Sequence, residues 1–277
     1  MSNDPAPSTA TPPGADLSDR VTVFVTTVGA PGFEACLQHV ERQDVRFETR
    51  IIDHVAPMNA AFQKMVDDCT TPYYVQVDED MLLRPNAVRW LYDRMTESEP
   101  DVAIVVAYLL DTHLGFPVQG IKMFRHEIVR NFPFAAAEAC ELDHNGRLMA
   151  AGYRLRIFRP EEVADSEDGT MGLHGTHWSP RAVYERYATL QRKYRRFPDR
   201  LRPVGDWPRM ILQRFLDEGS ETDLFALLGV IAGRLEALDG TGAEKDYRTY
   251  ENLAGFDQAE AFVEAFAAAR ATPSPDR

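Results

Sequence analysis

The chain has 277 residues, of which 44% are apolar and 26% are charged, a composition typical of a folded globular protein. Its formal net charge of -13 argues against a general binder of nucleic acids or anionic membranes, because such proteins need a basic surface. The three cysteines, Cys36, Cys69 and Cys140, lack the spacing of a zinc site or a disulfide framework, so they fit a reducing cytoplasm.

Both ends of the chain are rich in Pro, Ser, Thr and Ala. Such segments bury too little surface to fold alone, which predicts disordered tails over residues 1–19 and 271–277. The first residues do not show the charged start and apolar core of a signal peptide. No run of residues reaches the roughly 18 apolar side chains that a membrane-spanning helix needs.

The segment 20–110 alternates apolar strands with amphipathic helices. This alternation predicts an α/β fold, in which a mostly parallel sheet is flanked by helices on both faces. The predicted strands cover 21–27, 46–53, 73–77 and 101–110, and the predicted helices cover 33–43, 57–69 and 85–96.

Beyond residue 110 the pattern is weaker. We interpret 111–202 as the second half of the same domain and 203–270 as a helical C-terminal extension. Ser179 followed by Pro180 predicts a helix start, because serine suits the N-cap and proline the first helical position. The elements expected here are a short helix at 124–131, a strand at 153–158, an acidic loop at 161–176, and helices at 179–196, 206–219, 221–238 and 257–270.

The most informative stretch is the apolar run from Tyr73 to Val77, which ends in Asp78, Glu79 and Asp80. A strand that ends in acids presents their carboxylates at its carboxyl edge, where open α/β sheets bind ligands. Clustered acids repel one another unless a cation lies among them. Two carboxylates one residue apart can hold a hard divalent metal that also binds a diphosphate. The alternatives are a solvated loop or a helix N-terminus.

The chain resembles nucleotide-sugar-dependent glycosyltransferases of the GT-A fold, most closely those of family 2. The resemblance is strongest over about residues 20–110 and moderate over 150–200. It rests on the first strand 23–27, the second strand ending at Asp53, the segment 58–62, the stretch from Thr71 to Asp80, the pair Glu167-Asp168, and the cluster of His174 and His177.

The resemblance implies roles for these positions. Thr26 and Thr27 would line the nucleotide pocket, Asp53 would bind the base, commonly uracil, and Asp78 would face the ribose. Asn59 would either reach the nucleotide or cap its helix. Asp80, with Asp78, would hold Mn²⁺ or Mg²⁺ on the donor diphosphate, and His177 or His174 would complete the metal ligands. Asp168 is the best match for the catalytic base, while the neighbouring acids Glu167 and Asp165 remain alternatives.

The implied reaction moves a sugar from a nucleotide-diphosphate sugar, with a UDP-sugar favoured, to an acceptor hydroxyl with inversion. A divalent ion would stabilise the charge that develops on the leaving diphosphate, and a carboxylate would take the acceptor proton. The acceptor would be a carbohydrate, a lipid-linked sugar or a small molecule, and nucleic acid is not an expected partner. Homo-oligomerisation and a location at the inner face of the membrane, rather than free in the cytoplasm, stay open.

Three other functions compete with this interpretation. A sugar-nucleotide nucleotidyltransferase would normally carry a glycine-rich basic loop after the first strand, but the segment 28–32 has no basic residue. A phosphatase with an Asp-x-Asp nucleophile would carry its acids after the first strand, not the third. A non-catalytic nucleotide-binding module would be favoured by loss of the acids, yet Asp78 and Asp80 are both present.

Two segments of the second half have open interpretations. The basic stretch 181–202 would neutralise the donor diphosphate, attract an anionic acceptor, or form a solvated helix face. The helix beginning at Leu224 is apolar nearly all round, which predicts burial in the core, with an oligomer interface or a membrane surface as alternatives.

Overall fold

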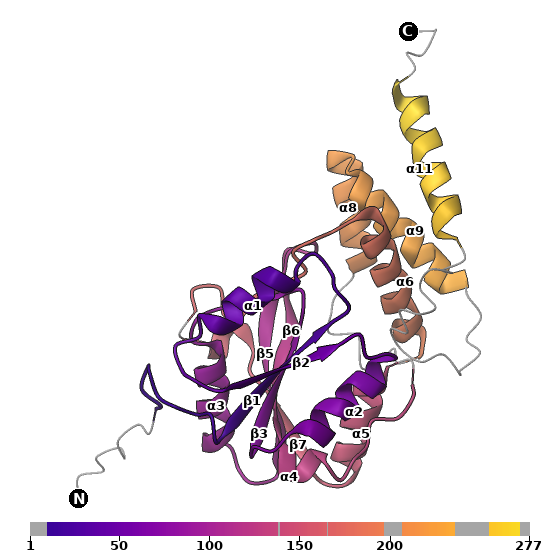
Figure 1. The fold of residues 1–277 in the computed structure, drawn as a ribbon. Coiled ribbons are helices and arrows are strands. Elements are labelled where there is room, and N and C mark those ends of the chain that lie inside the picture. The colour runs from indigo at the N-terminus through magenta and orange to yellow at the C-terminus, as the bar shows by residue number, and fades with distance from the viewer. Residues whose placement is uncertain (1–9, 138, 165, 197–206, 236–254, 272–277) are drawn as a thin grey trace, which may run out of the picture. The chain divides into compact units, whose positions relative to one another are not determined.

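The computed structural model describes residues 10–137, 139–164, 166–196, 207–235 and 255–271 (Figure 1). The chain divides into two compact units, Met1–Thr176 and His177–Arg277.

The first unit is built on one eight-stranded sheet. The strand order is β2-β1-β3-β6-β5-β8-β4, with β7 beside β5. Strands β6 and β4 run antiparallel to their neighbours, and every other pairing is parallel. The predicted α/β fold with a mostly parallel sheet is therefore confirmed. The strands are β1 (Val21–Thr27), β2 (Glu48–Asp53), β3 (Tyr73–Asp78), β4 (Met81–Leu83), β5 (Val102–Asp111), β6 (Pro117–Arg125), β7 (Arg154–Ile157) and β8 (Gly172–His174).

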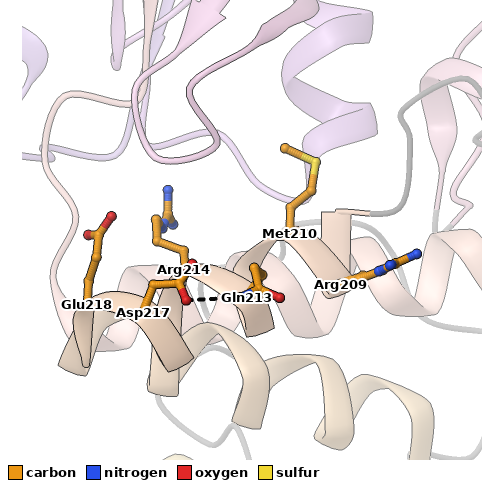
Figure 2. A pocket seen from close by; sticks show the side chains of 6 residues that line it. All are labelled: Arg209, Met210, Gln213, Arg214, Asp217 and Glu218. Carbon is orange, nitrogen blue, oxygen red and sulfur yellow. Dashed lines mark hydrogen bonds between the residues drawn. The ribbon is translucent and has the colours of Figure 1, made fainter.

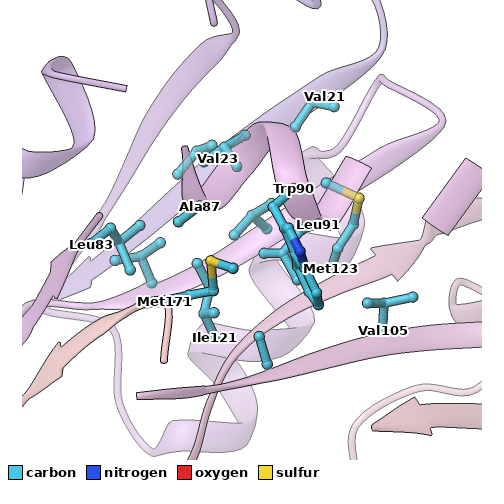
Figure 3. Close-up of a cluster of buried hydrophobic side chains, with 14 of the residues drawn as sticks. Val21, Val23, Leu83, Ala87, Trp90, Leu91, Val105, Ile121, Met123 and Met171 are labelled. Carbon is cyan, nitrogen blue, oxygen red and sulfur yellow. The ribbon is translucent and has the colours of Figure 1, made fainter. Parts of the chain in front are cut away.

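Helices cover both faces of this sheet. One face packs against α1 (Phe33–Glu41) and α3 (Ala87–Glu97), and Figure 3 shows the apolar core between them, with Val23, Leu91 and Met123 among its members. The other face packs against α2 (Met58–Asp68), α4 (His126–Val129) and α5 (Cys140–Ala150). Because both faces are buried there, the strands β1, β3 and β5 are buried along nearly their whole length, whereas β2 and β7 alternate between more and less exposed residues.

Several elements differ from the sequence prediction. Strand β6 was not expected, and the helix predicted from residue 124 begins only at His126 as α4. Helix α5 was missed, and the predicted loop 161–176 contains the short strand β8 and a 3₁₀ turn at Pro160–Glu162. These elements depend on distant partners: β6 pairs with β3 and β5, and β8 pairs with β4 and β5. Local patterns do not report such pairing.

The N-terminal segment also differs from the predicted tail over residues 1–19. Residues 10–19 contact the first unit: Leu17 is buried, its backbone N–H donates to the carbonyl of Arg46 at 2.7 Å, and Asp16 pairs with Arg46 at 3.1 Å. Residues 1–9 and 272–277 lie outside the described residues, so the rest of that prediction is not tested.

The second unit is helical where the structure describes it. Ser179 caps its first helix as predicted, because its Oγ accepts the backbone N–H of Ala182 at 3.1 Å. The unit begins at His177, so this helix belongs with the C-terminal helices instead of with the predicted segment 111–202. Its helices are α6 (Pro180–Arg196), α8 (Trp207–Glu218), α9 (Glu221–Leu235) and α11 (Phe256–Ala271).

Helix α9 is only partly buried. Leu224, Phe225 and Gly229 lie in the interior of the unit, whereas Ile231 and Leu235 are 53% and 79% exposed. The prediction of a buried helix therefore holds for one side of α9. Across the described parts of both units, no helix is long and apolar enough to cross a membrane.

Candidate active site

The topology brings the predicted polar residues of the first unit to one edge of the sheet. Strands β1, β2, β3, β5 and β8 run in the same direction, so their carboxyl ends meet there. This edge, called the carboxyl edge below, is where open α/β sheets bind ligands. Its residues include Thr26 and Thr27 of β1, Asp53 of β2, Asp78 of β3, Asp111 of β5 and His174 of β8.

Asp78 is anchored to the neighbouring strand. Its Oδ1 accepts the hydroxyl of Thr26 at 2.8 Å and the side-chain amide of Gln76 at 3.4 Å. Thr26 and Asp78 are register partners in the parallel pair of β1 and β3, which explains why the two side chains meet. The contact holds the carboxylate of Asp78 at the end of the sheet, where a ligand's hydroxyl groups could reach it.

Glu79 has a different role, which the sequence analysis did not assign. Its carboxylate accepts the hydroxyl of Thr27 and the backbone N–H groups of Val28 at 3.1 Å and Ala30 at 2.8 Å. These bonds tie the loop after β1 to the end of β3. The middle acid of the triplet therefore shapes the rim of the site.

Asp80 faces His174 across the β4–β8 pair. The Oδ2 of Asp80 lies 3.7 Å from Nε2 of His174, while Nδ1 of the same ring lies 3.3 Å from Oδ2 of Asp111. The side chain of Asp111 is fully buried, and that of His174 is 18% exposed. Asp111 was missed, although it carries the same signal as Asp53 and Asp78, an acid that ends an apolar strand.

The fit to a divalent metal rests on Asp80 and His174. Among the described residues, no group of three His, Cys, Asp or Glu side chains has the geometry to hold a metal ion. The 3.7 Å between Asp80 Oδ2 and His174 Nε2 is less than two ligand bonds of about 2.1 Å each, so one ion can contact both atoms. Mg²⁺ bound with substrate phosphates commonly has only one or two protein carboxylates, so a site with two protein ligands fits such an ion.

The other predicted metal ligands have different surroundings. Asp78 is oriented by Thr26, as described above. His177 is exposed and belongs to the second unit, so its role as a ligand stays a prediction. The structure therefore favours His174 of the two histidines.

The predicted base-binding residue, Asp53, lies at the end of β2. The carboxylate of Asp53 is 65% exposed, and its Oδ1 lies 2.5 Å from Nδ1 of His54. His54 has a φ of 50°, and its ring lies beside Gly29 in the loop after β1. No local pattern points to His54, because its position depends on this left-handed backbone and on the loop that follows another strand.

Asn59, at the start of α2, carries a buried oxygen. Its Oδ1 is shielded from solvent and has no hydrogen-bond partner among the described residues. Buried acceptors are nearly always satisfied in folded proteins. A donor on a bound ligand would satisfy this one, which supports the nucleotide role over the helix-capping alternative, and no side-chain cap hydrogen bond is made at this helix.

Asp168 lies away from Asp80. Its Oδ1 accepts Arg84 Nη2 at 2.8 Å, Ser166 Oγ at 2.7 Å, and the backbone N–H and hydroxyl of Thr170 at 3.0 and 2.8 Å. Burial alone would raise the pKa of Asp168, but these donors outweigh it and hold the pKa well below its usual range. A carboxylate with so low a pKa is a weak base in this conformation.

The register explains the separation of Asp168 from Asp80. Met81 pairs with His174 and Leu83 with Gly172, and Arg84 then bonds Met171. His174 and Met171 are three residues apart, or roughly 10 Å along a strand. The loop 166–170 thus adjoins the end of the β4–β8 pair opposite to Asp80.

Glu167, the second predicted catalytic acid, is exposed. Within the described residues it has no hydrogen bond or ion pair, in contrast to its neighbour Asp168. Asp165 lies outside the described residues.

A shallow hollow lies on the surface of the described part of the second unit (Figure 2). All six lining residues come from one helix, α8, and Gln213 donates to Asp217 there at 3.0 Å. None of the predicted site residues lines this hollow, so it is not a candidate for the active site. The lining residues are Arg209, Met210, Gln213, Arg214, Asp217 and Glu218.

Comparison with known proteins gives matches at the level of structure. No family model and no curated protein matches the sequence. The structure is similar to a mannosyltransferase from Pyrobaculum calidifontis in complex with GDP-Man and Mn²⁺, with 15% identity, a TM-score of 0.45, and coverage of 97% of this chain and 85% of that one.

Two further matches cover about half of the chain. Glucosyl-3-phosphoglycerate synthase from Mycobacterium tuberculosis is 14% identical with a TM-score of 0.37, covering 50% of this chain and 69% of that one. A 2-C-methyl-D-erythritol 4-phosphate cytidylyltransferase from Thermus thermophilus is 13% identical with a TM-score of 0.35, covering 57% and 94%.

Proposed function

We propose that this protein is a metal-dependent glycosyltransferase. It moves a sugar from a nucleotide-diphosphate sugar, with a UDP-sugar favoured, to an acceptor hydroxyl. The observation that carries the proposal is the pairing of Asp80 with His174 at the carboxyl edge, beside Asp78. A carboxylate and an imidazole that face each other at the ligand-binding edge of an α/β sheet suit a divalent ion and a diphosphate.

The nucleotide would lie over the ends of β1, β2 and β3. Asp78, held by Thr26, would accept hydroxyl groups of the ribose. Thr27 lines the same rim and holds the loop through Glu79. Asp53 is exposed and accepts hydrogen bonds only, which suits an N–H group of a base, and the buried oxygen of Asn59 can accept another donor.

Asp80 and His174 would hold Mn²⁺ or Mg²⁺. When bound, such an ion neutralises the charge that develops on the leaving diphosphate. The chain's own part is to orient the two ligands: Asp111 contacts the far side of the His174 ring, and Gly175 donates its N–H to the carbonyl of Asp80 at 3.0 Å.

The acceptor proton would go to a carboxylate of the loop 166–170, as inverting transfer requires. Of the two predicted acids, Glu167 suits this role better, because the carboxylate of Asp168 already accepts four hydrogen bonds. The acceptor itself, a carbohydrate, a lipid-linked sugar or a small molecule, stays a prediction.

The loop after β1 does not have the features that a nucleotidyltransferase needs. Such an enzyme would use this loop to bind a nucleoside triphosphate, through backbone N–H groups and basic side chains. Here the N–H groups of Val28 and Ala30 already donate to Glu79, and the segment 28–32 contains no basic residue. The loop is therefore closed to a triphosphate as it stands, which favours the glycosyltransferase proposal.

The proposal is tested by thermal unfolding of the whole protein with nucleoside diphosphates and nucleotide sugars, with and without Mn²⁺. A ligand that binds the native state raises its apparent stability by mass action. We expect UDP or a UDP-sugar to raise the unfolding temperature only when Mn²⁺ is present, and Asp80→Ala to abolish that increase. Asp67→Ala, at an exposed position on α2, is the matched control and should leave the increase unchanged.

Two outcomes would contradict the proposal. Stabilisation by a nucleoside triphosphate alone, unchanged in Asp80→Ala, would favour a nucleotidyltransferase. No stabilisation by any nucleotide, with the protein folded, would remove the nucleotide-sugar site altogether.

A further inference from the structure

His174 lies between two carboxylates because three strands align there. The register pairs Asp111 of β5 with His174 of β8, and His174 with Met81, the residue after Asp80. The fully buried Asp111 is therefore on one side of the ring and the partly exposed Asp80 on the other. This arrangement depends on the backbone pairing of three strands.

The carboxylate of Asp111 is held in place from the backbone. Its Oδ1 accepts the N–H groups of His113 at 3.1 Å and Leu114 at 2.8 Å. These bonds leave Oδ2 directed at Nδ1 of His174, 3.3 Å away. Backbone donors to a carboxylate favour its ionised form, which accepts hydrogen bonds and donates none.

The proton on the His174 ring follows from this contact. Because an ionised Asp111 only accepts, Nδ1 of His174 must carry the hydrogen that joins them. In a neutral ring the lone pair then lies on Nε2, the atom that faces Asp80. The 3.7 Å between Nε2 and Asp80 is too long for a direct hydrogen bond, so the Asp80 carboxylate does not itself require a proton on Nε2.

We propose that Asp111 is a positioning residue, which fixes the orientation and tautomer of His174 so that Nε2 presents its lone pair beside Asp80. Histidines that bind metals usually donate their other N–H to a carboxylate or carbonyl, and loss of that partner commonly lowers metal affinity 10–100-fold. Asp111 acts through His174 and does not touch the ion. The metal-binding purpose of this arrangement rests on the proposed function. The tautomer of His174, however, can be measured in the protein without any ligand.

The first measurement is nitrogen NMR of the His174 ring in the metal-free protein. We expect the proton on Nδ1 in the wild type. Asp111→Asn keeps the size of the side chain and one oxygen for the backbone N–H groups, but it offers an amide N–H to His174. The proton should then move to Nε2. Asp93→Asn, a change at another buried aspartate, is the matched control and should leave His174 unchanged.

The second measurement is Mn²⁺ affinity, followed by the electron paramagnetic resonance of unbound Mn²⁺. Asp111→Asn and His174→Ala should each weaken binding about 10–100-fold. In the double variant, Asp111→Asn should add nothing to His174→Ala, because Asp111 acts only through the ring. A further loss in the double variant would show an independent role and would overturn the proposal.

The two measurements separate the positioning role from the proposed function. If the wild-type ring carries its proton on Nε2, the proposed role of Asp111 is wrong, whether or not the protein binds Mn²⁺. This test uses the wild type alone, so it does not depend on the folding of a variant. Normal Mn²⁺ affinity in a folded Asp111→Asn protein also overturns that role, while the function stands. If wild type binds no Mn²⁺ although the ring is protonated on Nδ1, the metal site fails and the positioning of His174 stands.

Discussion

Three consecutive acids at the end of β3 have three different surroundings. Asp78 bonds to Thr26 on the adjacent strand, Glu79 binds the loop after β1, and Asp80 faces His174 on β8. Only Asp78 belongs to β3, while Glu79 and Asp80 form the turn that leads into β4, so the three side chains meet different partners. A motif of like residues therefore need not be one ligand set, and each acid has its own expected effect on mutation.

The two acids of the loop 166–170 should respond differently to loss of charge. In Glu167→Gln we expect kcat for sugar transfer to fall at least about 100-fold with nucleotide binding retained, since general bases contribute on that order. In Asp168→Asn we expect a loss of stability of about 1 kcal/mol, discounted for exposure, and less than about a tenfold fall in kcat.

Steady-state kinetics and thermal unfolding of both variants check this pair. A large loss of kcat in Asp168→Asn at unchanged stability would make Asp168 the base instead. Full activity in both variants would mean that no base lies in this loop, and would favour a retaining reaction.

His144 predicts an acid sensitivity of the first unit. The side chain is fully buried on α5, its ring stacks on Phe134 at 4.1 Å between centroids, and neither ring nitrogen has a hydrogen-bond partner among the described residues. Burial, and then the charge of Arg147, lowers the pKa of His144 from 6.5 to about 4. The unfolded chain therefore binds the proton first as the pH falls.

The direction of the pH effect follows from the linkage between proton binding and folding. The contribution of the neutral His144 ring to the free energy of unfolding is intact above pH 6.5 and is lost as the pH falls toward 4. The loss is about 2 kcal/mol at pH 5. In His144→Leu this loss should be absent, so the wild type should lose about 2 kcal/mol more than the variant between pH 7.5 and pH 5. Denaturant unfolding at the two pH values measures the difference. Equal losses in both proteins would show that the ring is not buried in its neutral form.

At the scale of elements, α6 and α9 pack at backbone distance. A Cβ on Gly229 would collide with the carbonyl oxygen of Tyr184, and one on Gly233 with that of Ala188. The two glycines are four residues apart and face the same helix, so they form the seam of the pair. Tertiary packing, and not helix propensity, places glycine here, because alanine is the better helix former.

Helix propensity and packing predict changes of opposite sign in the free energy of unfolding for Gly229→Ala. Propensity alone would stabilise the protein by about 1 kcal/mol, whereas the collision should destabilise it by about 1–3 kcal/mol or more. We expect destabilisation in denaturant unfolding. Ala232→Ser, at a half-exposed site on the same helix, is the control and should change stability by less than about 0.5 kcal/mol. A stabilised Gly229→Ala protein would contradict the close approach of α6 and α9.

At the scale of the whole molecule, the carboxyl edge belongs to one of two compact units. The residues from Thr26 to His174 lie in the first unit, and the helices from α6 onward lie in the second. Chains with two such units commonly unfold in more than one step. A ligand stabilises the unit that binds it.

We therefore expect calorimetry of the whole chain to show two transitions. UDP with Mn²⁺ should raise the temperature of one transition and leave the other where it was. A single transition that moves as a whole would mean that the two units unfold together and would contradict this expectation.

The sequence by itself determined the α/β class and the edge at which the site lies. Continuous apolar strands such as 21–27 and 102–111 can be covered only when helices pack on both faces, and polar residues at their carboxyl ends then meet at one edge. Asp53 and Asp78 follow this local logic, whereas His174 was predicted only from its cluster with His177, inside a segment that was expected to be a loop. Asp111 carried the same signal and was overlooked because the predicted strand stopped one residue early.

Only the tertiary structure decided which of these residues act together. Strands β6 and β8 exist because distant segments pair with them, and that pairing sets Asp111 and Asp80 on either side of His174. The parallel pairing of β1 and β3 directs Glu79 to the loop after β1, and the pairing of β4 with β8 brings Arg84 to Asp168. The reason is physical: a pattern along the chain reports the face and end of an element, whereas contacts between carboxylates, imidazoles and backbone N–H groups depend on register between strands far apart in sequence.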